Sequence, residues 1–194
     1  MKRRARINFE HNSRVDPGQA SLRPAFDKEG YIVGQDTLEE HYCYGSAQTH
    51  LQRTGKRLSN SCGPIAVCNV LQRLGEKVPL PQVFRDCERA ALLRGEWGTL
   101  PWGLGRCLKR RGYRVRYVYR RAKYDEALRQ ADAGILMFLR KEWPPTGHNI
   151  MVYCGADGRL NAKNAFTYGG THVLDFADAK VLWSVLILVK KRDA

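Results

Sequence analysis

The segment from Asn60 to Gly75 constrains the fold of this chain more than any other part of the sequence. Asn60 or Ser61 can cap the N-terminus of a helix there, and Pro64 fits the first helical position. Gly75 supplies the end of the helix. Apolar residues at helical spacing cover most of the circumference: Val67, Cys68, Val70, Leu71 and Leu74. Since a helix that is apolar nearly all round is buried, we expect this one to run through the core.

Cys62 stands at the N-terminus of this predicted helix. Aligned peptide dipoles place about half a positive charge at such an end. That charge favours the thiolate, so we expect the pKa of Cys62 to lie below the value of about 8.5 of a free thiol. Cys62 is therefore our candidate nucleophile, and a structural thiol at a helix end is the alternative.

A candidate base and its orienting residue come near the C-terminus. Residues 147–155 form a short apolar run that begins with Gly147 and His148, and a turn signal at 156–158 leads to a second strand with Asn164 near its far end. A tight turn brings the outer ends of two strands together, so we expect His148 and Asn164, 16 residues apart, to be neighbours. Alternatives for the orienting residue are Asn161, Asp157 and Asp175.

The order of these motifs resembles that of the papain-fold cysteine peptidases. Cys62-Gly63-Pro64 opens an apolar helix, and Gly147-His148 begins a strand much later. Within that fold the chain is most similar to the double-glycine leader peptidases, which occur in bacteriocin-exporting transporters and as free-standing domains. The resemblance covers roughly Tyr31 to Val189. It includes four further segments: 98–108, 112–115, 133–139 and 183–189.

This resemblance implies a cysteine peptidase that hydrolyses a peptide bond of a peptide or protein. Its catalytic residues are then Cys62, His148 and Asn164, acting through a thioester acyl-enzyme. No cofactor and no metal are implied. An acyltransferase or transglutaminase-like enzyme on the same fold is one alternative, because an amine can replace water in the second step. A non-catalytic basic binding module is the other.

The resemblance also suggests residues around the nucleophile. Gln35, ahead of Tyr44-Gly45, matches a leader motif of some free-standing members, so Gln35 is the expected side-chain donor to the oxyanion. Many relatives have a glutamine about six residues before the cysteine, where this chain has Lys56, and Gln52 and Asn60 remain alternatives. Asn164 stands where leader peptidases usually have Asp. Candidates for lining the substrate cleft are Trp97, Thr99 and Gly147, with Trp102 and Trp143 as further aromatic residues in loops, where packing is the alternative.

Composition favours one domain in a reducing compartment. The chain has 194 residues, of which 43% are hydrophobic, enough for one core. We expect a domain over residues 31–194 after an irregular basic extension over residues 1–30. No apolar run approaches the ~20 residues that span a membrane, and no signal-peptide core follows the basic start. Six dispersed cysteines without a CxxC motif favour a cytoplasmic protein, and His41 with Cys43 lacks the second ligand pair of a zinc site.

The positive charge needs a separate explanation. The formal net charge is +14 and the pI is about 9.8. Arg114 and Arg116 alternate with apolar and aromatic residues in a predicted strand, and Arg120 and Arg121 follow. A solvated face of the sheet is the simplest interpretation. An anionic partner is the alternative, either nucleic acid or an acidic peptide or membrane surface.

Helices come first in this sequence and strands later, which is typical of an α+β fold. Besides the central helix, the apolar spacing predicts helices over residues 81–93, 100–111 and 124–132. It predicts strands over residues 113–119, 133–139, 147–155, 159–165 and 183–189. We therefore expect N-terminal helices, including the nucleophile helix, to pack on a C-terminal antiparallel sheet.

Overall fold

The computed structural model describes residues 3–95, 98–141, 146–164, 172–177 and 180–192. Its α-helices are α1 (Arg3–Asn12), α2 (Gln35–Glu39), α3 (Ala47–Thr54), α4 (Cys62–Arg73), α5 (Leu80–Cys87), α6 (Pro101–Arg110) and α7 (Tyr124–Arg129). Short 3-10 helices are η1 (Ala20–Ala25), η2 (Glu88–Ala90), η3 (Leu92–Gly95), η4 (Arg121–Lys123) and η5 (Val173–Ala177). The strands are β1 (Arg114–Val118), β2 (Ala133–Arg140), β3 (Gly147–Cys154), β4 (Leu160–Lys163) and β5 (Val181–Lys190).

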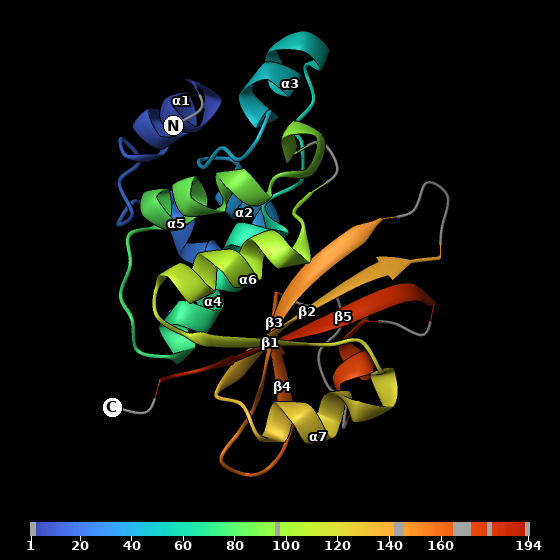
Figure 1. The fold of residues 1–194 in the computed structure, drawn as a ribbon. Helices are drawn as coiled ribbons and strands as arrows, with labels where there is room; N and C mark the ends of the chain where they lie inside the picture. Colours follow the sequence, from blue (N-terminus) through green and yellow to red (C-terminus); the bar gives the residue numbers. More distant parts are fainter. Residues whose placement is uncertain (1–2, 96–97, 142–145, 165–171, 178–179, 193–194) are drawn as a thin grey trace.

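The strands form one antiparallel sheet in the order β1-β5-β2-β3-β4. Helices α4 and α6 cover one face of this sheet, with α5 packed on them, and α7 lies on the other face (Figure 1). The predicted α+β class, with helices first and an antiparallel sheet later, is confirmed. One predicted helix is shorter than expected, because α5 ends at Cys87 and two 3-10 turns follow it.

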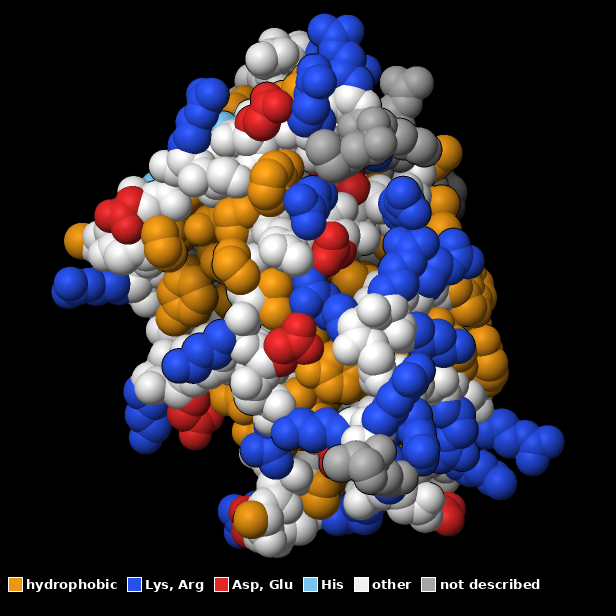
Figure 2. Space-filling view, turned by 60° about the vertical axis from the view of Figure 1, so that its left-hand side comes forward, with side chains coloured by type: hydrophobic (Ala, Val, Ile, Leu, Met, Phe, Trp, Pro, Cys, Tyr) orange, Lys and Arg blue, Asp and Glu red, His pale blue; other side chains and the backbone are white. Residues whose placement is uncertain are grey.

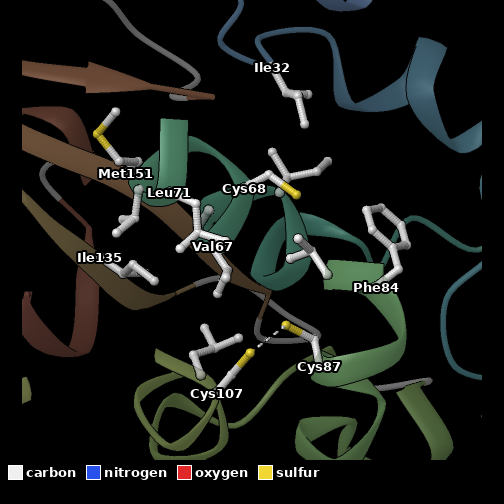
Figure 3. Packing of buried hydrophobic residues seen from close by; sticks show 14 of the residues in the cluster. Ile32, Val67, Cys68, Leu71, Phe84, Cys87, Cys107, Ile135 and Met151 are labelled. Carbon is white, nitrogen blue, oxygen red and sulfur yellow. Dashed lines mark hydrogen bonds between the residues drawn. The ribbon is translucent and has the colours of Figure 1, made fainter. Parts of the chain in front are cut away.

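Adjacent residues of β2 and β3 supply two separate cores, since successive side chains of a strand point to opposite faces. Ile135 and Met151 belong to the cluster that packs on α4, which we call the α4-side cluster (Figure 3). Leu136 and Ile150 belong to the cluster that packs on α7 and η5, which we call the α7-side cluster. The sheet therefore separates two apolar layers.

Helix α4 is the central helix that the sequence predicts. Every residue from Cys62 to Leu71 is buried, and Gly75 follows the helix with a positive φ of 78°. Its N-terminus packs closely on a neighbouring segment: a Cβ added at Gly63 would lie 2.5 Å from Thr99 Oγ1. A side chain there would force the two segments apart, so glycine after Cys62 is a packing requirement.

The N-terminal segment is a correction to the sequence analysis. The expected irregular extension instead contains the helix α1, which contacts α5, and the 3-10 helix η1. Leu22 and Ala25 join the α4-side cluster, and Asn12 donates to the carbonyl of Cys43 at 3.0 Å. Sequence periodicity missed α1 because its residues are mostly polar; tertiary contacts hold it in place.

All six cysteines are free thiols. The sulfurs of Cys87 in α5 and Cys107 in α6 lie 3.9 Å apart (Figure 3). Cys68 and Cys107 are buried among apolar residues, as the sequence predicts, whereas Cys154 is half-buried. Among the helices described here, none is long and apolar enough to cross a membrane.

Candidate active site

Cys62 is the first residue of α4, and its side chain is only 5% exposed. The group at hydrogen-bond distance from its sulfur is the amide of Asn149, whose Nδ2 donates to Sγ at 3.4 Å. Asn149 comes from the third position of β3 and is itself buried. The tertiary structure thus brings the start of β3 to the start of α4, as the proposed catalytic arrangement requires.

The expected lowering of the Cys62 pKa is wrong for this structure. Burial raises the pKa of the thiol above its ordinary value, and the carboxylate of Glu39 adds to that rise. The Asn149 amide and the N–H of Gly63 act in the opposite direction, but burial is the larger effect. A helix N-terminus favours a thiolate only when the charged form is not desolvated as strongly as it is here.

His148 lies on the other face of the sheet from Cys62. It precedes Asn149 in β3, so the two side chains point in opposite directions. The His148 ring meets the Phe138 ring edge-on, with centroids 5.9 Å apart, and Phe138 is part of the α7-side cluster. In this structure the β3 side chain at the Cys62 sulfur is therefore that of Asn149, and the neighbouring His148 ring lies on the other face of the sheet.

His148 and Asn164 do meet, as the spacing predicts, but the His148 ring contacts the backbone of Asn164 and not its side chain. Nε2 of His148 lies 2.7 Å from the backbone oxygen of Asn164, so this nitrogen donates and carries the proton. Burial lowers the pKa of His148 to about 4, against the effect of the Asn164 carbonyl, and the charge of Arg140 adds to the lowering. The imidazole is consequently neutral near pH 7.

The Asn164 side chain faces the α4 side of the sheet. Asn164 follows β4 with a positive φ of 62°, and its Nδ2 donates to Oε1 of Gln35 at 3.0 Å. Gln35 in turn donates from Nε2 to Glu39 at 3.1 Å and to Ser59 Oγ at 3.0 Å. The predicted oxyanion donor therefore links Asn164 to the loop before Cys62, and its amide protons are used within that network.

Glu39 is a site residue that the sequence analysis missed. One carboxylate oxygen, Oε1, accepts the backbone N–H groups of Asn60 at 2.9 Å and Ser61 at 2.7 Å. These bonds hold the segment before α4, whose N-cap residue Ser61 makes no side-chain cap hydrogen bond. Burial raises the pKa of Glu39, partly offset by the hydrogen bonds from the backbone N–H groups of Ser61 and Asn60. No local pattern around Glu39 marks it, because only the fold brings α2 to α4.

Three buried oxygens near the start of α4 have no hydrogen-bond partner among the described residues: Asn60 Oδ1, Ser61 Oγ and Asn149 Oδ1. Unpaired buried polar atoms are costly, so the start of α4 is a polar site within an otherwise apolar core. The alternative oxyanion donors are engaged or distant. Asn60 Nδ2 donates to the carbonyls of Tyr44 and Gly95, and Gln52 is exposed on α3.

The residues expected to line the substrate cleft differ in burial, and only Thr99 is shown packed beside the start of α4. Thr99 is buried against Gly63, beside Cys62, and Gly147 is exposed at the start of β3. Trp102 is 47% exposed on α6. Trp97 and Trp143 lie outside the described residues.

The alternatives for the orienting residue are all engaged locally. Asp157 accepts from the backbone of Arg159, and Asp175 accepts from the backbone of His172. Asn161 donates to the carbonyl of Arg159. Across the described ranges, no group of three His, Cys, Asp or Glu side chains could hold a metal ion.

Solved structures that resemble this chain include two peptidase domains. One is the peptidase domain of Streptococcus ComA, a bi-functional ABC transporter of a quorum-sensing pathway, with 14% identity over 69% of this chain and 93% of that one, at a TM-score of 0.49. The other is a double-glycine motif protease from an AMS/PCAT transporter, solved with its leader peptide, with 16% identity over 67% of this chain and 84% of that one, at a TM-score of 0.46. The first is described as a peptidase domain and the second as a double-glycine motif protease.

Sequence comparison adds nothing further: no protein-family model and no curated protein matches the chain. With TM-scores of 0.49 and 0.46, the two structures share only part of their backbone arrangement with this chain.

Proposed function

We propose that this chain is a cysteine peptidase whose nucleophile is Cys62. The observation that carries the proposal is the position of its sulfur. Sγ lies at the N-terminus of the buried central helix, within hydrogen-bond distance of a β3 side chain. The backbone N–H groups of a helix start can hold the oxyanion of a tetrahedral intermediate.

In the proposed reaction, a base takes the Cys62 proton and the thiolate attacks the scissile carbonyl. The leaving amine takes the proton, and water then releases the acyl group from the thioester. His148 is the proposed base and Asn164 the residue that fixes its ring. Because the His148 ring faces the α7-side cluster, this role requires a bulge at the start of β3, which re-aims a side chain by one position.

The proposed substrate is a peptide or protein, and the proposed location is the cytoplasm, since six free thiols suit a reducing compartment. The sequence resemblance makes peptides with a double-glycine motif the first substrates to test. Competition with a small added amine separates the two enzymes: a peptidase still releases the free acid, whereas an acyltransferase forms the amide of the added amine.

The test is alkylation of the intact protein with iodoacetamide at pH 6, read by mass, together with hydrolysis of the double-glycine peptides. With β3 in the bulged arrangement that brings His148 to the sulfur, we expect one fast adduct, lost in Cys62→Ser and retained in Cys68→Ser, a matched change six residues further along the same buried helix. Hydrolysis should disappear in the first variant alone. Slow labelling spread over several cysteines, with no hydrolysis by the parent protein, would contradict the proposal.

A second candidate is a non-catalytic peptide-binding domain on the same fold. It is favoured by one observation: Asn149, which cannot act as a base, occupies the position beside Sγ. His148→Ala distinguishes the two functions. If His148 is the base, this change slows the alkylation of Cys62 at pH 6 by an order of magnitude or more. An unchanged rate, with a peptide that binds but is not cleaved, favours the binding domain.

A further inference from the structure

The positive charge of the chain is concentrated in one segment. Residues 98–124 contain nine Lys and Arg and no Asp or Glu. This segment forms α6, the edge strand β1 and η4. Lys and Arg side chains gather on the right-hand side of the view in Figure 2, with few acidic side chains among them.

Two aromatic rings are exposed within this basic segment. Trp102 on α6 is 47% exposed and Tyr119, directly after β1, is 54% exposed. Nε1 of Trp102 donates to Oη of Tyr119 at 3.3 Å, so the two rings are held side by side at the surface. Tyr117, between them and the core, donates to the Trp102 carbonyl at 3.5 Å. Two exposed rings in contact with each other therefore lie within the basic segment.

Two cations lie beside Tyr117, which contacts Trp102. Nζ of Lys109 lies 5.9 Å from the centroid of the Tyr117 ring. Arg106 follows Trp102 by one helical turn. Burial raises the pKa of Tyr117, and the charge of Arg106 opposes this rise in part. Within the described part of the chain, no carboxylate pairs with Arg106, Lys109 or Arg116.

The other side of the β1 edge has a basic hollow. Arg114 pairs in register with Lys190 of β5, and these two residues line a cavity of about 240 Å³ together with Arg116. Gln130, after the end of α7, lines it as well. Three cations around one small hollow are suited to a phosphate group.

We propose that α6 and the β1 edge bind single-stranded nucleic acid. The Trp102–Tyr119 pair supplies the rings on which unpaired bases stack, and the cations on both sides of β1 hold the phosphates. Stacking on exposed rings beside a positively charged groove is the physical basis of such binding. Duplex bases are already stacked and cannot use the rings. An anionic membrane would be favoured by apolar side chains that project from the surface, whereas here the two rings are tied to each other.

The experiment is fluorescence anisotropy of the full chain with a labelled 20-nucleotide single strand, at about 50 mM and 200 mM salt. We expect Trp102→Ala with Tyr119→Ala to weaken binding by roughly tenfold or more, at an unchanged salt dependence. Arg106→Gln with Arg116→Gln and Lys190→Gln should lower the log–log salt slope by about two units, since each single-strand phosphate contact contributes about 0.7. A matched triple change elsewhere, Arg14→Gln with Lys28→Gln and Lys56→Gln, should have much less effect.

Three controls make the outcome decisive. A duplex of the same length should bind more weakly and be unaffected by loss of the two rings. Vesicles of phosphatidylcholine with 30% phosphatidylserine should not compete with the single strand. The labelling rate of Cys62 should be the same in all variants, which shows that they fold. The proposal is overturned if the parent protein does not bind the strand at 50 mM salt, if both triple variants bind equally, or if only the vesicles bind.

Discussion

The two faces of the sheet differ most at the start of β3, where His148 and Asn149 are adjacent. On the α4 side, Asn149 reaches the Cys62 sulfur in a polar network with unpaired acceptors. On the α7 side, His148 packs on Phe138 and donates to a backbone carbonyl. Two adjacent residues of β3 therefore lie in different environments: Asn149 at the Cys62 thiol, and His148 in the apolar α7-side cluster.

In a strand that is buried on both faces, the sequence indicates only weakly toward which face of the sheet each side chain points. Ile150 and Val152 of one parity, and Met151 of the other, are all apolar, so either face of β3 could pack on α4. Strand alternation then gives no preference, and a shift by one residue would exchange every side chain. The pairing of β3 with its neighbours decides the question.

The largest expected effect tests whether the two apolar layers are independent. Ile135→Ala and Leu136→Ala remove fully buried side chains from opposite clusters, and each should cost about 2–5 kcal/mol of unfolding free energy. Their effects should add within about 0.5 kcal/mol, because the side chains share no partners. The control pair, Ile135→Ala with Met151→Ala, lies opposite in register on one face and should depart from additivity by more. Urea denaturation measures all of these.

The next effect is a pH dependence of the free energy of unfolding, which His148 on the α7 side of the sheet should contribute. The pKa of His148 falls from 6.5 to about 4 on folding, so the unfolded chain binds the proton more tightly. Stability from this group is complete above about pH 6.5 and is lost as the pH falls toward 4, by about 3 kcal/mol. His148→Gln should remove this part of the loss in urea melts at pH 7 and pH 4. His172→Gln, which changes an exposed histidine, should retain it.

A smaller effect tests the α4 side. Asn149→His places an imidazole beside the Cys62 sulfur, and we expect alkylation of Cys62 at pH 6 to become roughly tenfold faster, because imidazolium favours the thiolate. Asn149→Gln, which keeps an amide, should leave the rate near that of the parent. If Asn149→His has no effect and His148→Ala slows labelling, the bulged arrangement of β3 is the reactive one in solution.

The smallest effect concerns Glu39, whose pH dependence should oppose that of His148. Burial raises the pKa of Glu39, so its contribution to stability is present at low pH and is lost as the pH rises through the folded pKa. Glu39→Gln should reduce that loss while keeping an oxygen for the N–H groups of Asn60 and Ser61. Removing a negative charge near Cys62 should also speed its alkylation at pH 7, by less than about tenfold. Exposed Glu40→Gln is the control; an equal effect there would show that the charge acts only at long range.

Much of the fold could be predicted because its signals are local. The apolar circumference of 62–73 and the strand pattern of 133–139 identify α4 and β2, and Pro101 marks the start of α6. The polar helix α1 could not be predicted, since its stability comes from contacts with α5 and with the loop at Cys43. In the same way, Cys62 was identified by its helix end, whereas Asn149 and Glu39 were not.

Three features are predictable from the amino-acid sequence: a cysteine begins a buried helix, helices precede an antiparallel sheet, and His148 lies near Asn164. Each of these follows from periodicity and turn lengths, which act over a few residues. Three others arise only in the folded chain: Asn149 meets the sulfur, Glu39 holds the loop before it, and burial raises the pKa of the thiol. These depend on strand register and burial, which arise from contacts between segments far apart in the chain.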